Sequence, residues 1–286
     1  MSILSLKMRE NEPSLRPIGV FDSGTGGLTV VRALRDLLPY EDIFYIGDTA
    51  RLPYGGKSKS TIERYSIEIS GLLLAESSKM IVVACNTSSS LAVSKLEELL
   101  KVPVVGVIAP GARAAVKETR VGHVGVIGTR STIQSEAYER AIQALNPDVR
   151  VTSQACPLLV PLVEEAWLDE EVTREVLHRY LDPVVAAGID TLVLGCTHYP
   201  LLAPLIEEVA GPRIRLVDSA KNCAVAVKQT LREWGLESLE ETTGKLNVAL
   251  TDSSNSFLAT AKQVLRLDID SVETRIVQGV TLLETA

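Results

Sequence analysis

Two cysteines, Cys85 and Cys196, are the residues whose type and position point most directly to chemistry. Each follows a short, mainly apolar run, 81–84 or 192–195, and each precedes a polar pair and a segment of helical periodicity. We expect each thiol at the carboxyl end of a buried strand, where ligands bind in open α/β sheets. The free N–H groups and the positive end of a helix that starts there stabilise a thiolate. Two matching contexts favour a function over the alternative that each cysteine is only a small buried hydrophobe.

The other two cysteines, Cys156 and Cys223, lack this context, and we predict that they are chemically inert. The four cysteines form no C-x-x-C pair, and the chain has only three histidines. A zinc site with several Cys and His ligands would be hard to assemble, so we expect no metal. Free thiols are typical of a reducing cytosol, and we expect a cytoplasmic location.

The glycine-rich stretch 22–29 lies between a predicted strand and a predicted helix, as a phosphate-binding loop would. The dinucleotide fingerprint G-x-G-x-x-G fails, because Thr29 stands where the third glycine belongs. Asp22 at the strand end would also repel a pyrophosphate, although Asp48 lies where a ribose-binding acid would. A Walker A motif around 56–58 fails because its first glycine is missing. We therefore expect no bound nucleotide.

Four further side chains are candidates to assist a reaction near the two cysteines. His198 follows Cys196 by two residues and could act as a general acid or bind a substrate carboxylate, although a structural histidine fits the sequence equally well. Tyr54 lies in a loop that could close over a ligand or form an ordinary surface turn. Glu164 and Glu165 fall on a predicted helix with a solvated face, and one of them could turn inward.

Length, composition and charge bound the class of protein. The chain has 286 residues, which suggests two domains, and its 46% hydrophobic and 23% charged residues are typical of a globular protein. Its net charge of −7 repels phosphate backbones, so we expect no nucleic-acid partner. The first residues contain no long apolar run, so we expect neither a signal peptide nor a membrane partner.

The pattern along the chain predicts an α/β fold with parallel sheets, because short apolar runs alternate with segments of helical period. Glycines 188 and 211 stand where two helices should end. Strands are expected at 18–21, 43–46, 80–84, 104–108, 124–127, 151–154, 191–194 and 214–217, and less clearly at 246–250 and 274–277. Helices are expected at 28–38, 61–77, 89–99, 131–145, 171–187, 201–209 and 220–234.

The chain also contains a weak internal repeat. Residues 81–87 resemble residues 192–198, and residues 19–24 resemble residues 125–129, with a similar spacing within each pair. Any parallel sheet yields some strand ends that look alike, but two matched pairs favour two copies of one α/β unit.

Seven stretches, taken together and in order, resemble the cofactor-independent aspartate/glutamate racemase superfamily, and within it the bacterial glutamate racemases. They run through most of the chain, which makes the resemblance specific. The stretches are 17–27, 45–55, 83–87, 105–111, 126–129, 156–164 and 194–200.

The resemblance implies two similar α/β domains, each a mainly parallel sheet flanked by helices, with the active site in the cleft between them. Residues 1–109 and 218–286 would form the first domain, and residues 110–217 the second, inserted one. It also implies catalytic roles for Cys85 and Cys196, one on each side of the substrate Cα, assisted by Asp22 and His198. Asp48 and Glu164 match carboxylates with less certain roles. The implied substrate contacts are Asp22, Ser23, Tyr54, Gly55, Asn86, Thr87, Thr129, Thr197 and His198.

The implied reaction is the interconversion of L- and D-glutamate, which supplies D-glutamate for peptidoglycan, by a homodimer without any cofactor. Two bases on opposite faces of Cα explain how a proton leaves one side and returns on the other. Each sulfur must approach Cα to ~3–3.5 Å, so the two sulfurs should lie roughly 7 Å apart.

Two alternatives stay open at the level of the sequence. An aspartate racemase of the same superfamily would suit the residues around both cysteines. A non-catalytic ligand-binding or regulatory protein on this fold would keep the cavity without the proton transfer.

Overall fold

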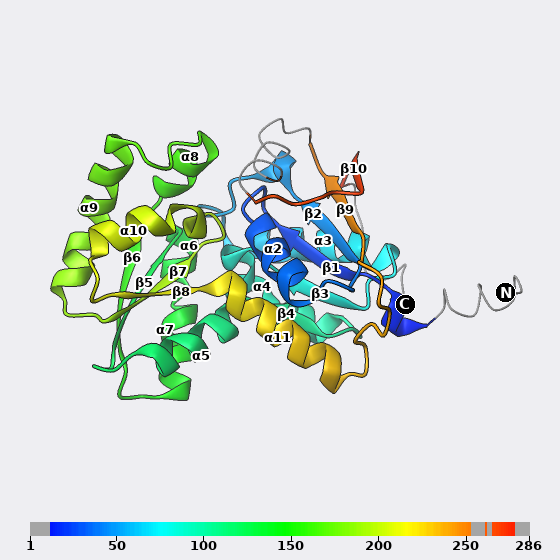
Figure 1. Ribbon diagram of the computed structural model, residues 1–286, viewed down its shortest axis with the longest axis horizontal. Coiled ribbons are helices and arrows are strands. Elements are labelled where there is room, and N and C mark those ends of the chain that lie inside the picture. Colours follow the sequence, from blue (N-terminus) through cyan, green and yellow to red (C-terminus); the bar gives the residue numbers. More distant parts are fainter. Residues whose placement is uncertain (1–11, 253–260, 262–264, 278–286) are drawn as a thin grey trace, which may run out of the picture.

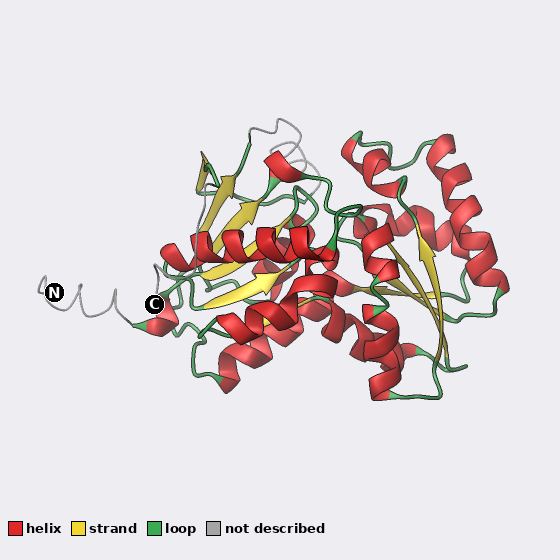
Figure 2. Cartoon of the chain, turned by 180° about the vertical axis from the view of Figure 1, so that it is seen from behind, coloured by secondary structure: helices red, strands yellow, loops and turns green. Residues whose placement is uncertain are grey.

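The computed structural model describes residues 12–252, 261 and 265–277 of the chain. Among these residues, two parallel sheets form the framework, and they lie side by side with helices around them (Figures 1 and 2). The first sheet has the order β10-β9-β2-β1-β3-β4. Its strands are β1 (Ile18–Asp22), β2 (Ile43–Gly47), β3 (Met80–Val83), β4 (Val104–Gly106), β9 (Leu246–Leu250) and β10 (Ser271–Thr274).

The second sheet has the order β6-β5-β7-β8. Its strands are β5 (His123–Gly128), β6 (Arg150–Ala155), β7 (Thr191–Gly195) and β8 (Arg215–Asp218). The α-helices are α2 (Leu28–Leu37), α3 (Lys59–Ala75), α4 (Asn86–Leu99), α5 (Ile108–Glu118), α6 (Arg130–Gln134), α7 (Ala137–Leu145), α8 (Leu159–Glu164), α9 (Glu171–Ala186), α10 (Ala203–Ala210) and α11 (Ser219–Glu233). The described residues also form the 3₁₀ helices η1 (Pro13–Leu15), η2 (Thr49–Arg51) and η3 (Tyr199–Leu202). None of the helices in the described part of the chain is long and apolar enough to cross a bilayer.

The central strands β1, β2 and β3 of the first sheet are buried on both faces, which explains why they are mainly apolar. Successive side chains of a strand point to opposite faces. Val20 and Val82 accordingly belong to a core with α2 and α11, whereas their neighbours Phe21 and Val83 belong to a second core with α3 and α4. A parallel sheet covered by helices on both sides requires this pattern.

The two sheets share one strand order. In the first, β1 lies between β2 and β3, with β4 beyond β3; in the second, β5 lies between β6 and β7, with β8 beyond β7. The ends of β3 and β7 are therefore equivalent positions, and they are the positions that Cys85 and Cys196 follow. The repeat expected from the sequence thus has a counterpart in the topology. The domain boundaries at 109/110 and 217/218 stay a prediction.

Most expected elements are present, and four differ for physical reasons. The strand expected at 104–108 ends at Gly106, because Ile108 already begins α5, a helix that the sequence pattern did not predict. The helix expected at 131–145 breaks in two at Glu136, whose φ of 53° lies in the left-handed region. The strand expected at 274–277 instead covers Ser271–Thr274, an exposed segment without the apolar pattern of a core strand. The helix expected at 201–209 begins as the 3₁₀ helix η3.

Candidate active site

Both cysteines line one cavity of about 280 Å³, formed at the carboxyl ends of the two sheets. Every site residue expected from the sequence except Asp22 lies in its wall. The first half of the molecule, the part built around the first sheet, contributes Ser23, Gly24, Leu52, Pro53, Tyr54, Gly55, Gly56, Cys85, Asn86 and Thr87. The second half, the part built around the second sheet, contributes Thr129, Arg130, Pro157, Val160, Pro161, Glu164, Cys196, Thr197 and His198.

Cys85 is the residue that immediately precedes helix α4, as expected from the sequence. Its backbone is extended, its carbonyl accepts a hydrogen bond from the N–H of Ser89 at 2.8 Å, and its side chain is buried. Burial, followed by the negative charge of Asp22, raises the pKa of the Cys85 thiol to about 12, although hydrogen bonds from Ser88 oppose the shift. Cys85 therefore carries its proton at neutral pH.

Cys196 has a different environment. Its Sγ atom lies 3.8 Å from Nδ1 of His198, and Nε2 of that histidine lies 3.5 Å from Oε1 of Glu164. Burial lowers the pKa of His198, but its contacts with the Cys196 sulfur and the Glu164 carboxylate outweigh burial and raise the pKa to about 10. The imidazole is therefore a cation at neutral pH, and its Nδ1–H can donate to the sulfur.

The sequence predicted a helix directly after Cys196, and this prediction is wrong. Two residues in a turn separate Cys196 from η3, which is a 3₁₀ helix of four residues, and α10 begins only at Ala203. The positive charge next to Cys196 therefore comes mainly from His198 and not from the start of an α-helix. Glu164, at the end of α8, turns toward His198, and Glu165 stays exposed.

Asp22 lies behind the cavity wall, where it fills the glycine-rich loop. Its Oδ2 accepts hydrogen bonds from the backbone N–H groups of Gly24 at 3.1 Å and Gly27 at 2.9 Å. Its Oδ1 accepts a hydrogen bond from Oγ1 of Thr197 at 3.4 Å. The N–H groups that a phosphate would need are thus already bound by the chain's own carboxylate, which agrees with the expectation that no nucleotide binds.

The glycine-rich loop also lets the two halves approach each other. A Cβ atom at Gly26 would lie 2.4 Å from Oγ1 of Thr197 and 2.5 Å from Nδ1 of His198. Any side chain at this position would push the Cys196 segment away from the Asp22 segment. Glycine is required here because a Cβ atom has no room. Its backbone conformation is not the reason, since its φ lies outside the left-handed region.

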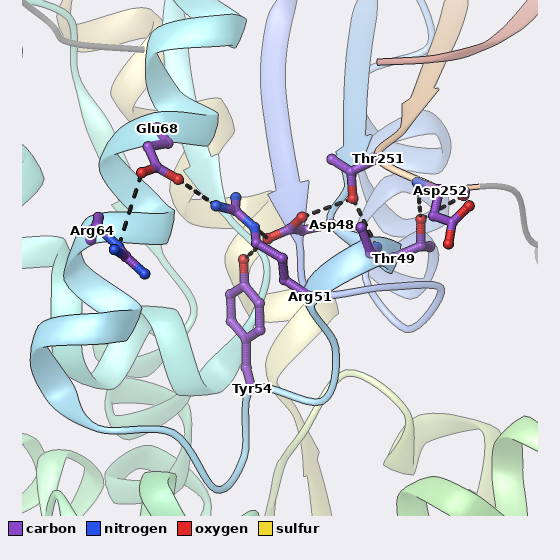
Figure 3. A network of polar contacts seen from close by, with 9 residues as sticks. Asp48, Thr49, Arg51, Tyr54, Arg64, Glu68, Thr251 and Asp252 are labelled. Carbon is purple, nitrogen blue, oxygen red and sulfur yellow. Dashed lines mark hydrogen bonds and ion pairs between the residues drawn. The ribbon is translucent and has the colours of Figure 1, made fainter. Parts of the chain in front are cut away.

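Tyr54 is held in the wall by a polar network behind it, drawn in Figure 3. Its hydroxyl donates to Oδ2 of Asp48, which also accepts from Nε of Arg51 at 2.6 Å. The other oxygen of Asp48 accepts from Oγ1 of Thr251 at 2.8 Å, and Arg51 also pairs with Glu68. Asp48 therefore orients the tyrosine and connects the C-terminal segment to the site, and it is not placed as a ribose-binding acid.

The loop that carries Tyr54 contacts the second half of the molecule. The backbone N–H and the hydroxyl of Ser131 donate to the carbonyl of Gly55 at 3.0 Å and 2.9 Å. Oγ1 of Thr87 lies 3.0 Å from Oγ1 of Thr129. These contacts bridge the two halves beside the cavity.

The remaining two cysteines have surroundings that fit the predicted lack of reactivity. Cys223 lies in the core of the first half and Cys156 in that of the second, and both are buried. Burial raises the pKa of the Cys223 thiol to about 12 and also raises that of Cys156. Within the part of the chain that the structure describes, no cluster of His, Cys, Asp and Glu is placed to hold a metal.

The sequence analysis did not identify two residues that matter at this site. Arg130 lines the cavity directly after Thr129, but one arginine at a strand end gives no distinctive signal. Tyr138 donates a hydrogen bond to Asn86, and its position could not be inferred because the break before α7 was not predicted. The site as a whole presents a protonated thiol and a second sulfur beside a cation, both in the wall of one cavity.

Comparison with known proteins places this chain among racemases. A family model described as Asp/Glu/Hydantoin racemase matches residues 28–228. The chain is 52% identical over 266 residues to a glutamate racemase of Syntrophus aciditrophicus, covering 93% of this chain and 98% of the relative. It is 48% identical over 265 residues to a glutamate racemase of Neisseria meningitidis serogroup A, covering 92% and 98%.

Solved structures agree with these relatives. The glutamate racemase isoform RacE1 from Bacillus anthracis has a TM-score of 0.87 and 39% identity, and it covers 92% of this chain and 97% of its own. The glutamate racemase from Francisella tularensis in complex with D-glutamate has a TM-score of 0.85 and 34% identity, with 93% and 98% covered.

Proposed function

We propose that this isomerase, a chain that belongs to the Asp/Glu/hydantoin racemase family, interconverts L-glutamate and D-glutamate. Relatives about half identical over nearly their whole length are glutamate racemases. The observation that carries the proposal is that Cys85 and Cys196, from equivalent strand ends of the two sheets, line the same cavity.

In the proposed mechanism, one sulfur is a thiolate and the other a thiol at any moment. The Cys196 thiolate, paired with the imidazolium of His198, takes the proton from Cα of one enantiomer, so the C–H bond breaks and an S–H bond forms. The electron pair stays on Cα and spreads into the neighbouring carboxylate. The Cys85 thiol then gives its proton to the opposite face, which leaves Cys85 as the thiolate. The reverse reaction runs through the same steps in the opposite order.

A carbanion next to a carboxylate is costly, and the cavity supplies groups that offset this cost. Asn86, Thr87 and Thr197 present polar side chains in the wall, and the first N–H groups of α4 lie beside Cys85. Fixed donors aimed at the developing charge are often the largest contribution to catalysis, and exclusion of water strengthens them. Arg130 adds a positive charge that favours a substrate with two carboxylates.

Asp22, Glu164 and Tyr54 have supporting roles in this proposal. Asp22 is near enough to Cys85 and His198 for its charge to raise the pKa of both, so it favours the protonated forms of these groups. Glu164 holds the outer nitrogen of the imidazolium. Tyr54, fixed by Asp48, closes one side of the cavity over the substrate.

The wider setting is part of the same proposal. D-glutamate is a building block of peptidoglycan, so the enzyme would supply cell-wall synthesis and support cell shape. It would act in the cytoplasm, as a homodimer, on free glutamate and without a cofactor.

Circular dichroism with purified enzyme tests the proposal directly. We expect L-glutamate and D-glutamate each to lose their signal on the way to a racemic mixture, and L-aspartate to react far more slowly. A faster reaction with aspartate would assign the chain to the sister activity. Binding of glutamate without loss of optical activity or exchange of the Cα hydrogen would indicate a non-catalytic binding protein.

A further inference from the structure

Tyr138 contacts the segments that carry both cysteines. It is the second residue of α7, is 3% exposed, and donates a hydrogen bond from its hydroxyl to Oδ1 of Asn86 at 2.7 Å. Asn86 directly follows Cys85. The tyrosine ring lies against Gly195, which directly precedes Cys196, and a Cβ atom at Gly195 would come 3.2 Å from Cε2 of the ring. One buried side chain thus spans the two halves behind the cavity.

The hydrogen bond from Tyr138 decides which way the amide of Asn86 faces. Because Oδ1 accepts from the tyrosine, the Nδ2 group must point away from the tyrosine, on the opposite side of the Cβ–Cγ bond. Asn86 is 2% exposed and lines the cavity, and its Nδ2 atom is buried without a hydrogen-bond partner among the residues that the structure describes. Buried donors are rarely left unpaired, so this N–H group is available for an oxygen of a bound molecule.

The geometry around the ring keeps Tyr138 in this position. A Cβ atom at Gly111 of α5 would lie 3.1 Å from Cε1 and 3.3 Å from the hydroxyl of the tyrosine, so the ring packs directly on this helix. The left-handed backbone of Glu136 ends α6 and sets a new direction for α7. As a result, α6 holds Thr132 near Thr87 while α7 presents Tyr138 to Asn86. Burial also raises the pKa of Tyr138, so the hydroxyl remains a donor and takes no part in proton transfer.

We propose that Tyr138 is a positioning residue for the racemisation: it orients Asn86 so that Nδ2 donates to the substrate carboxylate as negative charge builds up on it. This inference rests on the proposed function. The hydrogen bond to a carboxylate oxygen becomes stronger when the electron pair of Cα spreads into that group. Tyr138 therefore supports the transition state more than the bound substrate, and its loss should lower kcat more than it raises KM.

The variant Tyr138→Phe removes only the hydroxyl and keeps the packing of the ring. Removal of one donor in an oxyanion site costs about 10²–10³ in kcat, and a donor that is misoriented but still present should cost less, about tenfold. We expect KM to change less than about twofold, because ground-state binding is largely retained. We also expect a larger isotope effect on kcat with glutamate deuterated at Cα, because proton removal then limits turnover more strongly. A purely structural role would lower Tm and leave the isotope effect unchanged.

Two comparisons make this test specific. In a double-mutant cycle, Tyr138→Phe should have almost no further effect on kcat in an Asn86→Ala background, because the tyrosine acts through that amide. Tyr199→Phe is the matched control: this tyrosine is also fully buried, and its hydroxyl donates to the carbonyl of Cys156 at 2.9 Å. It should lose stability in a similar way but keep its isotope effect.

The outcomes separate this inference from the proposed function. An active wild-type enzyme whose Tyr138→Phe variant keeps its kcat and isotope effect would overturn the inference alone. Fully additive losses in the double-mutant cycle would also overturn it. A wild-type enzyme that does not racemise glutamate would overturn both proposals.

Discussion

The strand ends that carry Cys85 and Cys196 occupy equivalent places in the two sheets but have different electrostatic surroundings. Cys85 stands at the start of a full α-helix, near the negative charge of Asp22, and its thiol has a pKa raised to about 12. Cys196 stands before a turn and a short 3₁₀ helix, and it faces the cationic His198, which is backed by Glu164. The scaffold is repeated, whereas the charges placed on it are not.

This difference has a simple chemical meaning. A reaction that removes a proton from one face of Cα and returns a proton on the other needs a base and an acid at the same time. Two identical surroundings would favour the same protonation state for both sulfurs. Different surroundings allow one sulfur to hold a proton while the other is paired with a cation. The predictions below test whether the asymmetry exists and whether it matters.

Loss of either sulfur should have the largest effect. We expect Cys85→Ala and Cys196→Ala each to lower racemisation by ~10⁴-fold or more, because the reaction then lacks its acid or its base. Optical activity measured from both enantiomers checks this. Cys223→Ala is the matched control, because this cysteine is equally buried but lies outside the cavity, and it should retain most of the activity. A folded Cys85→Ala or Cys196→Ala enzyme with near wild-type turnover would refute the assignment.

Removal of the His198 imidazole should change the reactivity of Cys196 but not that of Cys85. We expect His198→Asn to lower kcat by ~10²-fold and to slow the alkylation of Cys196 by iodoacetamide near neutral pH, because the sulfur loses its countercharge. Alkylation of Cys85 should be slow in both enzymes, since its thiol is protonated. His178→Asn, which alters an exposed histidine paired with Asp182, serves as the control. The asymmetry would be refuted if mass spectrometry found Cys85 modified faster than Cys196 in the wild-type enzyme.

The stability of the fold should fall at alkaline pH, which is a smaller effect. The folded-state pKa of His198, about 10, exceeds its ordinary value of 6.5, so its contribution is complete below pH 6.5 and is lost as the pH rises to about 10. The pKa of Cys85 is raised from 9.0 to about 12, so the unfolded chain releases that proton first and stability falls further above pH 9.0. Each group contributes at most about 1.4 kcal/mol per pH unit.

Urea unfolding at several pH values measures this dependence. The His198→Asn variant should show a flatter fall in the free energy of unfolding between pH 6.5 and 10 than the wild type. An identical slope in the two proteins would show that the histidine is not held as a cation in the folded state.

The last prediction is that removal of metals or carbonyl cofactors has no effect on racemisation. In the proposed mechanism the two sulfurs act as acid and base without an electron sink, so dialysis against EDTA or treatment with hydroxylamine should leave racemisation unchanged. Activity that is lost in either treatment and restored by a metal or by pyridoxal phosphate would replace the two-thiol account with a cofactor-dependent one.

The sequence predicted the strand ends before Cys85 and Cys196, because strand ends depend on local patterns; the catalytic role of the two cysteines stays a prediction. Ile18–Asp22 and Leu246–Leu250 form strands where the apolar runs predict them. The hydrogen bonds between Asp22 and its own glycine-rich loop could not be predicted from the sequence. The loop has the composition of a phosphate site, and only the structure shows that its N–H groups donate to the Asp22 carboxylate. Tyr138 was missed because its role depends on the left-handed backbone of Glu136, which no residue type signals.

The most direct test of the central claim is racemisation of one enantiomer in heavy water, followed at early times. With two opposed sulfurs, the product should carry deuterium at Cα from its first formation, while the remaining substrate stays unlabelled. Deuterium that enters the substrate as fast as the product forms would mean that one base serves both faces, and would contradict the account.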